Sequence, residues 1–211
     1  MKSQTPAYDL SIFINCPFDR RYLPLFHALI FAIHDSGFYS RCALEVLDTG
    51  EARLAKIMRI IDQCGLGVHD LSRADASRTK LPRFNMPFEA GLFYGCKEFG
   101  TGRHKNKRIL VLDSEPYRYL KVLSDLAGQD AQWHHNKPEK VIEKVRNWLR
   151  TSSNLQGMPG GTKIWRRYQQ FRRDLPALLR TAHVSVKEIN QFEFYSDYRE
   201  FVVAWLKLHP L

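Results

Sequence analysis

The chain lacks an uninterrupted apolar run of the roughly 18–20 residues that a membrane-spanning helix needs. Residues 1–9 are polar and contain none of the apolar stretch that marks a secretory signal peptide. Internal repeats and low-complexity tracts are absent too, and 44% apolar with 26% charged residues is ordinary for a globular protein. These absences argue against membrane-spanning, collagenous and largely disordered classes. We therefore expect a cytoplasmic protein with no membrane partner.

Cysteine is scarce and widely spaced. The cysteines are Cys16, Cys42, Cys64 and Cys96. None forms a CxxC pair, and the spacings fit no zinc motif. The adjacent His134 and His135 also lack a partner at a metal-binding spacing. We expect reduced, mostly buried thiols, as in a reducing compartment, and no metal site.

Short apolar strands alternate with amphipathic helices over the first two thirds of the chain. The apolar patterns predict strands over 9–15, 38–47, 64–71, 107–113 and 129–135. They predict helices over 20–36, 50–63, 85–99, 115–126 and 138–151. This alternation predicts an α/β fold, a five-stranded parallel sheet with helices on both faces in the flavodoxin-like order 2-1-3-4-5. Gly65 and Gly67 in the third strand indicate close approach of a neighbouring segment.

A stretch rich in glycine and proline, residues 154–161, follows this region. Two further helices are predicted over 164–181 and 196–208. We therefore expect an α/β domain over residues 1–152 and a linker with a helical C-terminal extension over 153–211. The extension is too small to bury a large core alone.

Positive charge is concentrated towards the C-terminus. The net charge is +10, and from Lys137 onward there are 14 basic against 7 acidic residues. Basic pairs alternate there with aromatic residues, in the order Trp165, Arg166, Arg167, Tyr168, Phe171, Arg172 and Arg173. Such a cluster can grip nucleic-acid phosphates, an acidic protein or a polyanionic nucleotide. The aromatic residues fall at helical spacing, however, which favours rings packed inward and arginines in water, so nucleic acid is not the favoured partner.

Ligands of flavodoxin-like folds bind beyond the carboxyl ends of the strands, and several polar segments are predicted at that edge. Asn15, Cys16, Pro17 and Phe18 follow the first strand. Backbone N–H groups there can hold an anion, and the Phe18 ring can stack on a base. The alternative is a capped turn, with Asp19 as the cap and Phe18 as a hydrophobic staple.

Two acidic residues are also predicted near the same edge, and the second strand contains an arginine. Asp70, followed by Ser72, ends the third strand and can accept hydrogen bonds from sugar hydroxyls; a loop cap is the alternative. Glu51 opens the second helix and can reach a ribose or base, or it is a plain first-turn glutamate. Arg41 in the second strand needs a partner if it is buried, and Glu45 can supply one; the alternative is an exposed charge on an edge strand.

The strongest candidate is Glu89, in the first turns of the third predicted helix, for which Asn85 is a good N-cap. That helix is otherwise apolar, and Gly91 costs about 1 kcal/mol of helix propensity against alanine, which suggests that it makes room for a ligand. A carboxylate there can stabilise or attack the oxocarbenium-like cation of N-glycosidic cleavage. A cationic leaving group such as the nicotinamide of NAD needs no general acid, whereas a neutral base does. The alternative is a solvated glutamate that complements the helix dipole.

Three segments carry a resemblance to a known group: FINCPFD after the first strand, HDLS after the third, and PRFNMPFEAGL at the third helix. Together, over residues 9–112, they resemble the nucleoside 2-deoxyribosyltransferase-like and TIR-like group. The resemblance implies that Glu89 is the catalytic carboxylate, that Asp70 positions the ribose, and that residues 15–18 line the base or phosphate pocket. It implies N-glycosidic cleavage, by hydrolysis or transfer, of NAD or a related nucleotide or nucleoside as substrate, with no separate cofactor.

The chain departs from this group in its first-strand loop, which is not serine-rich, and in Glu-Ala-Gly where Glu-Leu-Gly is usual. The choice among nucleoside, nucleotide and NAD therefore stays open. The resemblance also implies a homo-oligomer or a regulatory protein partner, and a role in bacterial antiviral defence. A non-catalytic, TIR-like nucleotide sensor or assembly scaffold is the alternative function.

Overall fold

The computed structural model describes residues 7–73, 83–121 and 123–211. The described residues group by their contacts into two compact units. The sheet unit comprises those of Met1–Pro17 and Phe38–His135, and the helical unit comprises Phe18–Gly37 and Asn136–Leu211. This grouping follows packing rather than chain order, and the domain boundary expected between residues 152 and 153 stays a prediction.

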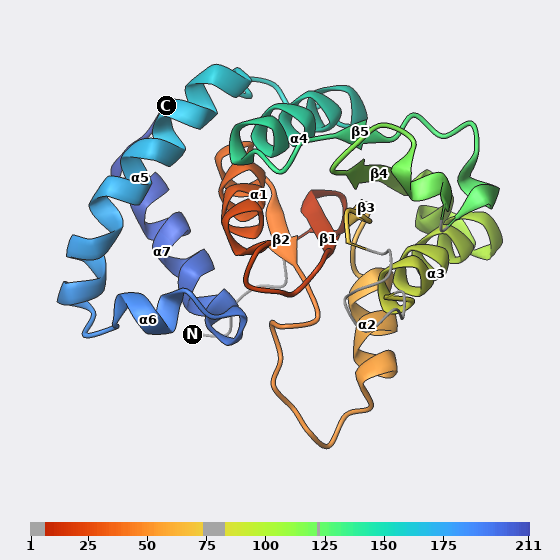
Figure 1. Cartoon of the computed structure of the whole chain (residues 1–211), viewed down its shortest axis with the longest axis horizontal. Coiled ribbons are helices and arrows are strands. Elements are labelled where there is room, and N and C mark those ends of the chain that lie inside the picture. Colours follow the sequence, from red (N-terminus) through yellow and green to blue (C-terminus); the bar gives the residue numbers. More distant parts are fainter. Residues whose placement is uncertain (1–6, 74–82, 122) are drawn as a thin grey trace. The chain divides into compact units, whose positions relative to one another are not determined.

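The sheet unit contains a five-stranded, all-parallel sheet (Figure 1). Its strands are β1 (Ser11–Asn15), β2 (Tyr39–Arg41), β3 (Leu66–Asp70), β4 (Arg108–Asp113) and β5 (Gln132–Trp133). The strand order β2-β1-β3-β4-β5 confirms the predicted α/β, flavodoxin-like fold. The two outer strands, β2 and β5, are shorter than predicted. Strand β2 ends at Arg41, where the chain turns.

Arg41 is buried and pairs with Glu45, which is one of the two alternatives that the sequence leaves open. Its Nε donates to Glu45 Oε2 at 2.7 Å, and its Nη2 donates to Gln63 Oε1 at 3.1 Å. These bonds offset part of the cost of burying a guanidinium beside the end of β2.

Two helices of the sheet unit pack against each other, α2 (Arg53–Asp62) and α3 (Asn85–Phe99), and α3 also contacts β1 and β3. The core beneath them includes Phe13, Ile57, Ile61 and Phe93, all buried. The apolar spacing of α2 predicts one stripe made of Leu54, Ile57, Met58 and Ile61. Ile57 and Ile61 are buried, but the prediction is wrong for Leu54 and Met58, which are exposed by 44% and 52%, because the helix is turned so that Ile60 is buried in their place.

The helix predicted over 115–126 is wrong. That segment instead contains two short 3-10 helices, η3 (Arg118–Lys121) and η4 (Ser124–Leu126). Elsewhere in the sheet unit, 3-10 helices are found at η1 (Tyr8–Leu10) and η2 (Gly102–Asn106). Tyr117 adopts a left-handed backbone with φ of 57°, which an α-helix does not accommodate.

A fully buried lysine closes the end of α2. Lys107 Nζ donates to the carbonyl oxygens of Ile61, at 2.7 Å, and Cys64, and lies 4.4 Å from the centre of the Phe93 ring. Burial lowers the pKa of Lys107. The side chain thus donates to buried carbonyls at the C-terminus of α2 and just beyond it, where a helix leaves its last carbonyls without intrahelical partners.

The helical unit is built around α1 (Leu23–Asp35), in which residues 28–33 have no exposed surface. Around it lie α4 (Pro138–Ser152), α5 (Gly161–Thr181), α6 (Val186–Ile189), η5 (Phe192–Phe194) and α7 (Tyr195–Leu208) (Figure 1). The segments α5 to α7 confirm the predicted helical C-terminal extension. Within the described ranges, no helix is both long and apolar enough to span a membrane.

Tyr168 and Phe171 of α5 are buried, as their spacing predicts, whereas Trp165 is half-buried. Arg166, Arg172 and Arg173 are exposed, but the expectation of arginines in water is wrong for Arg167, whose side chain is 13% exposed and ion-paired. The cysteines are free, and three of the four are buried, which confirms the expectation of mostly buried thiols.

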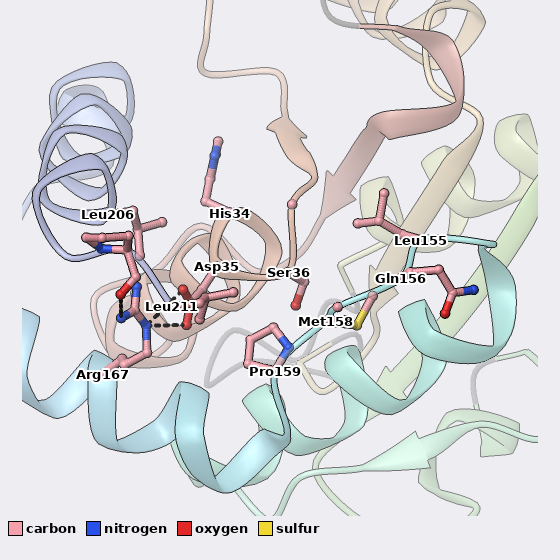
Figure 2. A pocket seen from close by; sticks show the side chains of 13 residues that line it. His34, Asp35, Ser36, Leu155, Gln156, Met158, Pro159, Arg167, Leu206 and Leu211 are labelled. Carbon is pink, nitrogen blue, oxygen red and sulfur yellow. Dashed lines mark hydrogen bonds and ion pairs between the residues drawn. The ribbon is translucent and has the colours of Figure 1, made fainter.

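An ion pair fastens α5 to the end of α1 (Figure 2). Arg167 Nε donates to both carboxylate oxygens of Asp35, at 3.0 and 3.1 Å, and its Nη2 donates to the His209 carbonyl at 2.7 Å. Burial raises the pKa of Asp35, and the Arg167 charge opposes that rise. A cavity of about 290 Å³ lies alongside, where the buried Ser36 hydroxyl has no hydrogen-bond partner among the described residues.

Candidate functional site

Asn15 fixes the position of the candidate helix at the carboxyl edge of the sheet. As the last residue of β1, it donates from Nδ2 to the Met86 carbonyl at 2.8 Å and lies 3.1 Å from His69 Nδ1. Met86 belongs to the first turn of α3, three residues before Glu89. The sequence therefore predicts correctly that α3 begins at the carboxyl edge of the sheet, and the hydrogen bond from Asn15 holds the first turn of α3 there.

His69 is a neutral structural histidine that is hydrogen-bonded to Asn15. Because its Nδ1 accepts from Asn15, its proton is on Nε2. Complete burial lowers the pKa of His69 to about 3, and the nearby Lys107 charge adds to this effect. A Cβ atom at Gly67 would lie 2.8 Å from both His69 Nε2 and the Phe93 ring, so side chains rather than backbone crowd this glycine. The predicted close backbone approach is found at Gly65, where a Cβ would lie 3.0 Å from the Tyr8 carbonyl oxygen.

Asp70 has the geometry of a loop cap. Its Oδ1 accepts from the Ser72 backbone N–H at 2.9 Å, and its Oδ2 lies 2.9 Å from His134 Nε2. The side chains of Asp70 and His134 have no exposed surface. A ribose could reach this carboxylate only if these bonds broke. The neighbouring Ser72 hydroxyl is also buried, but it has no hydrogen-bond partner in the described part of the chain.

A second buried carboxylate at this edge was missed by the sequence reasoning. Asp113 ends β4 and accepts from Arg118 Nε at 2.8 Å, while Arg118 Nη2 donates to the Leu71 carbonyl at 2.8 Å. Burial raises the pKa of Asp113, and Arg118 opposes the rise. The available signal was its position, since Asp113 ends its strand as Asp70 does. Together these groups form a buried polar network at the ends of β3 and β4.

Glu89 differs from the other buried acids because the fold leaves it almost unpartnered. The residue is 3% exposed, and no described residue donates a hydrogen bond to its carboxylate. Its one charged neighbour in the described ranges is Arg53 of α2, whose Nη2 lies 3.8 Å from Oε1 and whose side chain is 56% exposed. Burial raises the pKa of Glu89 to about 7, and the Arg53 charge offsets that rise only in part.

This environment excludes the solvated-glutamate alternative for Glu89. Burying a carboxylate without hydrogen bonds costs several kcal/mol, so such groups concentrate at functional sites. A Cβ at Gly91 would have no described heavy atom within 4 Å outside its own helix backbone and chain neighbours, so the space there does not depend on the glycine. The role of Gly91 in making room for a ligand stays a prediction, and burial of the Glu89 carboxylate is the stronger reason to treat Glu89 as a candidate.

The segment after β1 has the geometry of a capped turn. Cys16 and Pro17 are buried, and Asp19 Oδ1 accepts from the backbone N–H groups of Arg21 and Tyr22, at 3.0 and 3.2 Å. Phe18 belongs to the helical unit, where its ring lies edge-on to Phe26 and Phe192, with centroids 5.7 and 5.5 Å away. The proposed role of these residues in a base or phosphate pocket stays a prediction.

The remaining candidates lie on the surface of the sheet unit. Asn85 is exposed and is the first residue of α3, so its prediction as the N-cap is wrong; Phe84 occupies that position without a side-chain cap bond. Glu51 is partly exposed and pairs with Arg59, whose Nη2 lies 2.8 Å from Oε2. This ion pair lowers the pKa of Glu51, so its carboxylate is already served by a cation.

Among the residues with described positions, no group of three or more His, Cys, Asp or Glu side chains is arranged to hold a metal ion. Comparison of the chain with models of protein families, with curated proteins and with solved structures gives no match. The resemblance to the nucleoside 2-deoxyribosyltransferase-like and TIR-like group therefore remains a prediction that depends on its three motifs.

Proposed function

We propose that the protein cleaves the N-glycosidic bond of NAD or a related nucleotide or nucleoside, with Glu89 stabilising or trapping the ribosyl cation. The observation that carries the proposal is the buried Glu89 carboxylate, which no described residue hydrogen-bonds. A ribosyl cation held about 3–3.5 Å away would supply the missing partner. Because the Glu89 side chain is buried, this attraction would be stronger than at an exposed carboxylate.

The state of the neighbouring groups favours a leaving group that is already charged. His69 and His134, the buried histidines at this edge, are engaged with Asn15 and Asp70. A neutral base would need a proton from a general acid, whereas the nicotinamide of NAD leaves as a neutral molecule. In hydrolysis, the bond from C1′ of the ribose to the nicotinamide nitrogen breaks, water adds its oxygen to C1′, and one proton is released.

The test is to incubate the protein with NAD and with a panel of nucleosides and to measure the release of free base by chromatography. The reactions are run over a range of protein concentrations that includes assembled forms of the protein. Glu89→Gln should lower the rate at least about a hundredfold, since it removes the charge that the transition state requires. Glu98→Gln is the matched control, because Glu98 lies on the same helix, is exposed and pairs with Lys97. Equal rates for wild type and Glu89→Gln would refute the assignment, as would absence of base release at every concentration.

The second candidate is a nucleotide sensor or assembly scaffold without turnover. Exposed apolar side chains favour it, since Leu54 and Phe88, which adjoin Arg53 and Glu89 in sequence, are 44% and 54% exposed. This candidate predicts nucleotide-dependent oligomers without base release. Light scattering after size-exclusion chromatography, with and without NAD, distinguishes it from the enzyme. A cytoplasmic location and a role in antiviral defence belong to the proposal of either function.

A further inference from the structure

Two adjoining hollows lie within the helical unit, at the amino-terminal end of α1. The outer hollow has a volume of about 810 Å³ and is bounded by α1, α6 and η5. The inner one has about 200 Å³ and lies between α1, α5, α6 and α7. They share the lining residues Leu23, Pro24, Val186 and Asn190, so together they form one recess, which we call the α1–α6 groove. Its size is that of a small-molecule site.

Much of the groove lining is apolar. Leu23, Leu179 and Ile189 are buried, Phe192 is half-buried, and Val186 is 54% exposed at the shared section. A surface of this kind favours an occupant with an acyl or aryl body, because burying that body removes apolar area from water on both sides.

The charges of the groove are mostly positive. Arg20 and Lys187 line its outer part and Arg172 its inner part, and all three are exposed. No described residue supplies any of them with an acidic hydrogen-bonding or ion-pair partner. Glu193 is the one acidic side chain of the lining. The excess of cations would repel a cationic occupant and attract an anionic one.

The inner part also offers neutral hydrogen-bonding groups. His27 stacks on Tyr198 with ring centroids 3.8 Å apart, and burial lowers the pKa of His27 to about 3. None of the described residues forms a hydrogen bond with its ring nitrogens. Asn190 uses its Nδ2 on the Val186 carbonyl, which leaves its Oδ1 as an acceptor. These groups can orient a ligand without adding charge.

We propose that the α1–α6 groove binds a small organic anion with an apolar body. The acyl or aryl body lies on the apolar lining, and the carboxylate or phosphate head meets Arg172 and Lys187. A neutral apolar ligand would leave these cations unused, and a cationic one would be repelled. The site belongs to the helical unit and does not depend on the chemistry of Glu89.

The experiment is calorimetric titration of the full chain with four ligands that share a ten-carbon body: decanoate, decyl phosphate, decanol and decyltrimethylammonium. One anion per chain should bind, decanol should bind at least about tenfold more weakly, and the cation should not bind. Binding of either anion supports the proposal, and the tighter of the two identifies the head group.

Variants locate the site. Arg172→Gln and Lys187→Gln should each weaken decanoate binding about three- to tenfold, and more so at low salt. Arg173→Gln is the matched control, since Arg173 is an exposed arginine of the same helix outside the groove lining. Val186→Trp should block the groove from an exposed position, with circular dichroism confirming that each variant folds.

Three results would overturn the proposal: no binding of either anion, equal binding of decanoate and decyltrimethylammonium, or an equal effect of Arg172→Gln and Arg173→Gln. Unchanged affinity in a folded Val186→Trp variant would place the ligand elsewhere and overturn it as well. Because Glu89→Gln should leave decanoate binding unchanged, this test and the test of the proposed function fail independently.

Discussion

Replacing Glu89 by glutamine should stabilise the protein at neutral and alkaline pH. Burial raises the pKa of Glu89 from 4.5 to about 7. Because one pKa unit is equivalent to about 1.4 kcal/mol, holding this carboxylate ionised in the folded protein costs about 3 kcal/mol. Glutamine has a similar shape and no charge, so the Glu89→Gln variant avoids this cost.

The pH dependence gives the prediction its sign. Between pH 4.5 and 7 the folded protein keeps a proton on Glu89 that the unfolded chain releases, so wild-type stability falls as pH rises through this window. Below pH 4.5 both states are protonated and the cost disappears. The variant should therefore match the wild type near pH 4, apart from a constant offset, and gain up to about 3 kcal/mol by pH 8.

Urea unfolding at pH 4, 5, 6, 7 and 8, with equal m-values for both proteins, measures this difference. Glu98→Gln serves as the control, because Glu98 is exposed and its ion pair with Lys97 lowers its pKa. A difference between wild type and Glu89→Gln that does not change with pH would refute the reasoning. It would mean that the folded protein provides Glu89 with a hydrogen-bonding or charged partner, and Glu89 would then no longer be a candidate for catalysis.

Three further predictions follow from the same unit. Base release from NAD should rise with pH around a midpoint near 7, the pKa of Glu89, and Arg53→Gln should move that midpoint upward in a pH–rate profile because it removes the charge that lowers this pKa. Gly67→Ala should lower the free energy of unfolding by about 1–3 kcal/mol, because the added methyl group would overcrowd the core. Gly91→Ala should raise the free energy of unfolding by about 0.5–1 kcal/mol, because alanine has the higher helix propensity and the position has space for a methyl group. Chemical denaturation measures both changes, and similar effects of the two substitutions would contradict the difference in packing between the two glycines. Lys107→Met should destabilise the protein by about 1–3 kcal/mol, because the buried Cys64 carbonyl loses this donor, while the Ile61 carbonyl keeps the Cys64 backbone N–H, at 3.2 Å; an unchanged melting temperature would show that the Lys107 donor is dispensable.

Periodicity predicted the fold well where local pattern and packing agree. The runs around β1, β3 and β4 are short, apolar and bounded by turn residues, and each forms a strand within the predicted range. The prediction from sequence was wrong where tertiary contacts decide which face of a helix is buried. Leu54 and Met58 fit an amphipathic stripe with Ile57 and Ile61, and only packing against the core shows that Ile60 is buried in their place.

The candidate site was predictable in position but not in environment. Helical spacing after β3 indicated that Glu89 lies near the ligand-binding edge. Its burial and the looseness of its contact with Arg53, 36 positions earlier, depend on how α2 and α3 pack, which no local pattern specifies. For Asp70, the local cap bond to Ser72 was one of the two alternatives that the sequence offered, whereas the bond to His134 depends on the long-range pairing of β4 with β5 and could not be predicted.

The central helix of the helical unit makes the C-terminal helices part of a shared core. On α1, the Phe31 ring lies 5.4, 5.5 and 5.9 Å from the rings of Tyr168, Phe171 and Trp205, which belong to α5 and α7. Truncation before α5 would uncover this aromatic cluster to water, and aggregation of the shortened protein would follow. Loss of any activity on such truncation would report misfolding, and point substitutions are the sound way to separate the roles of the two units.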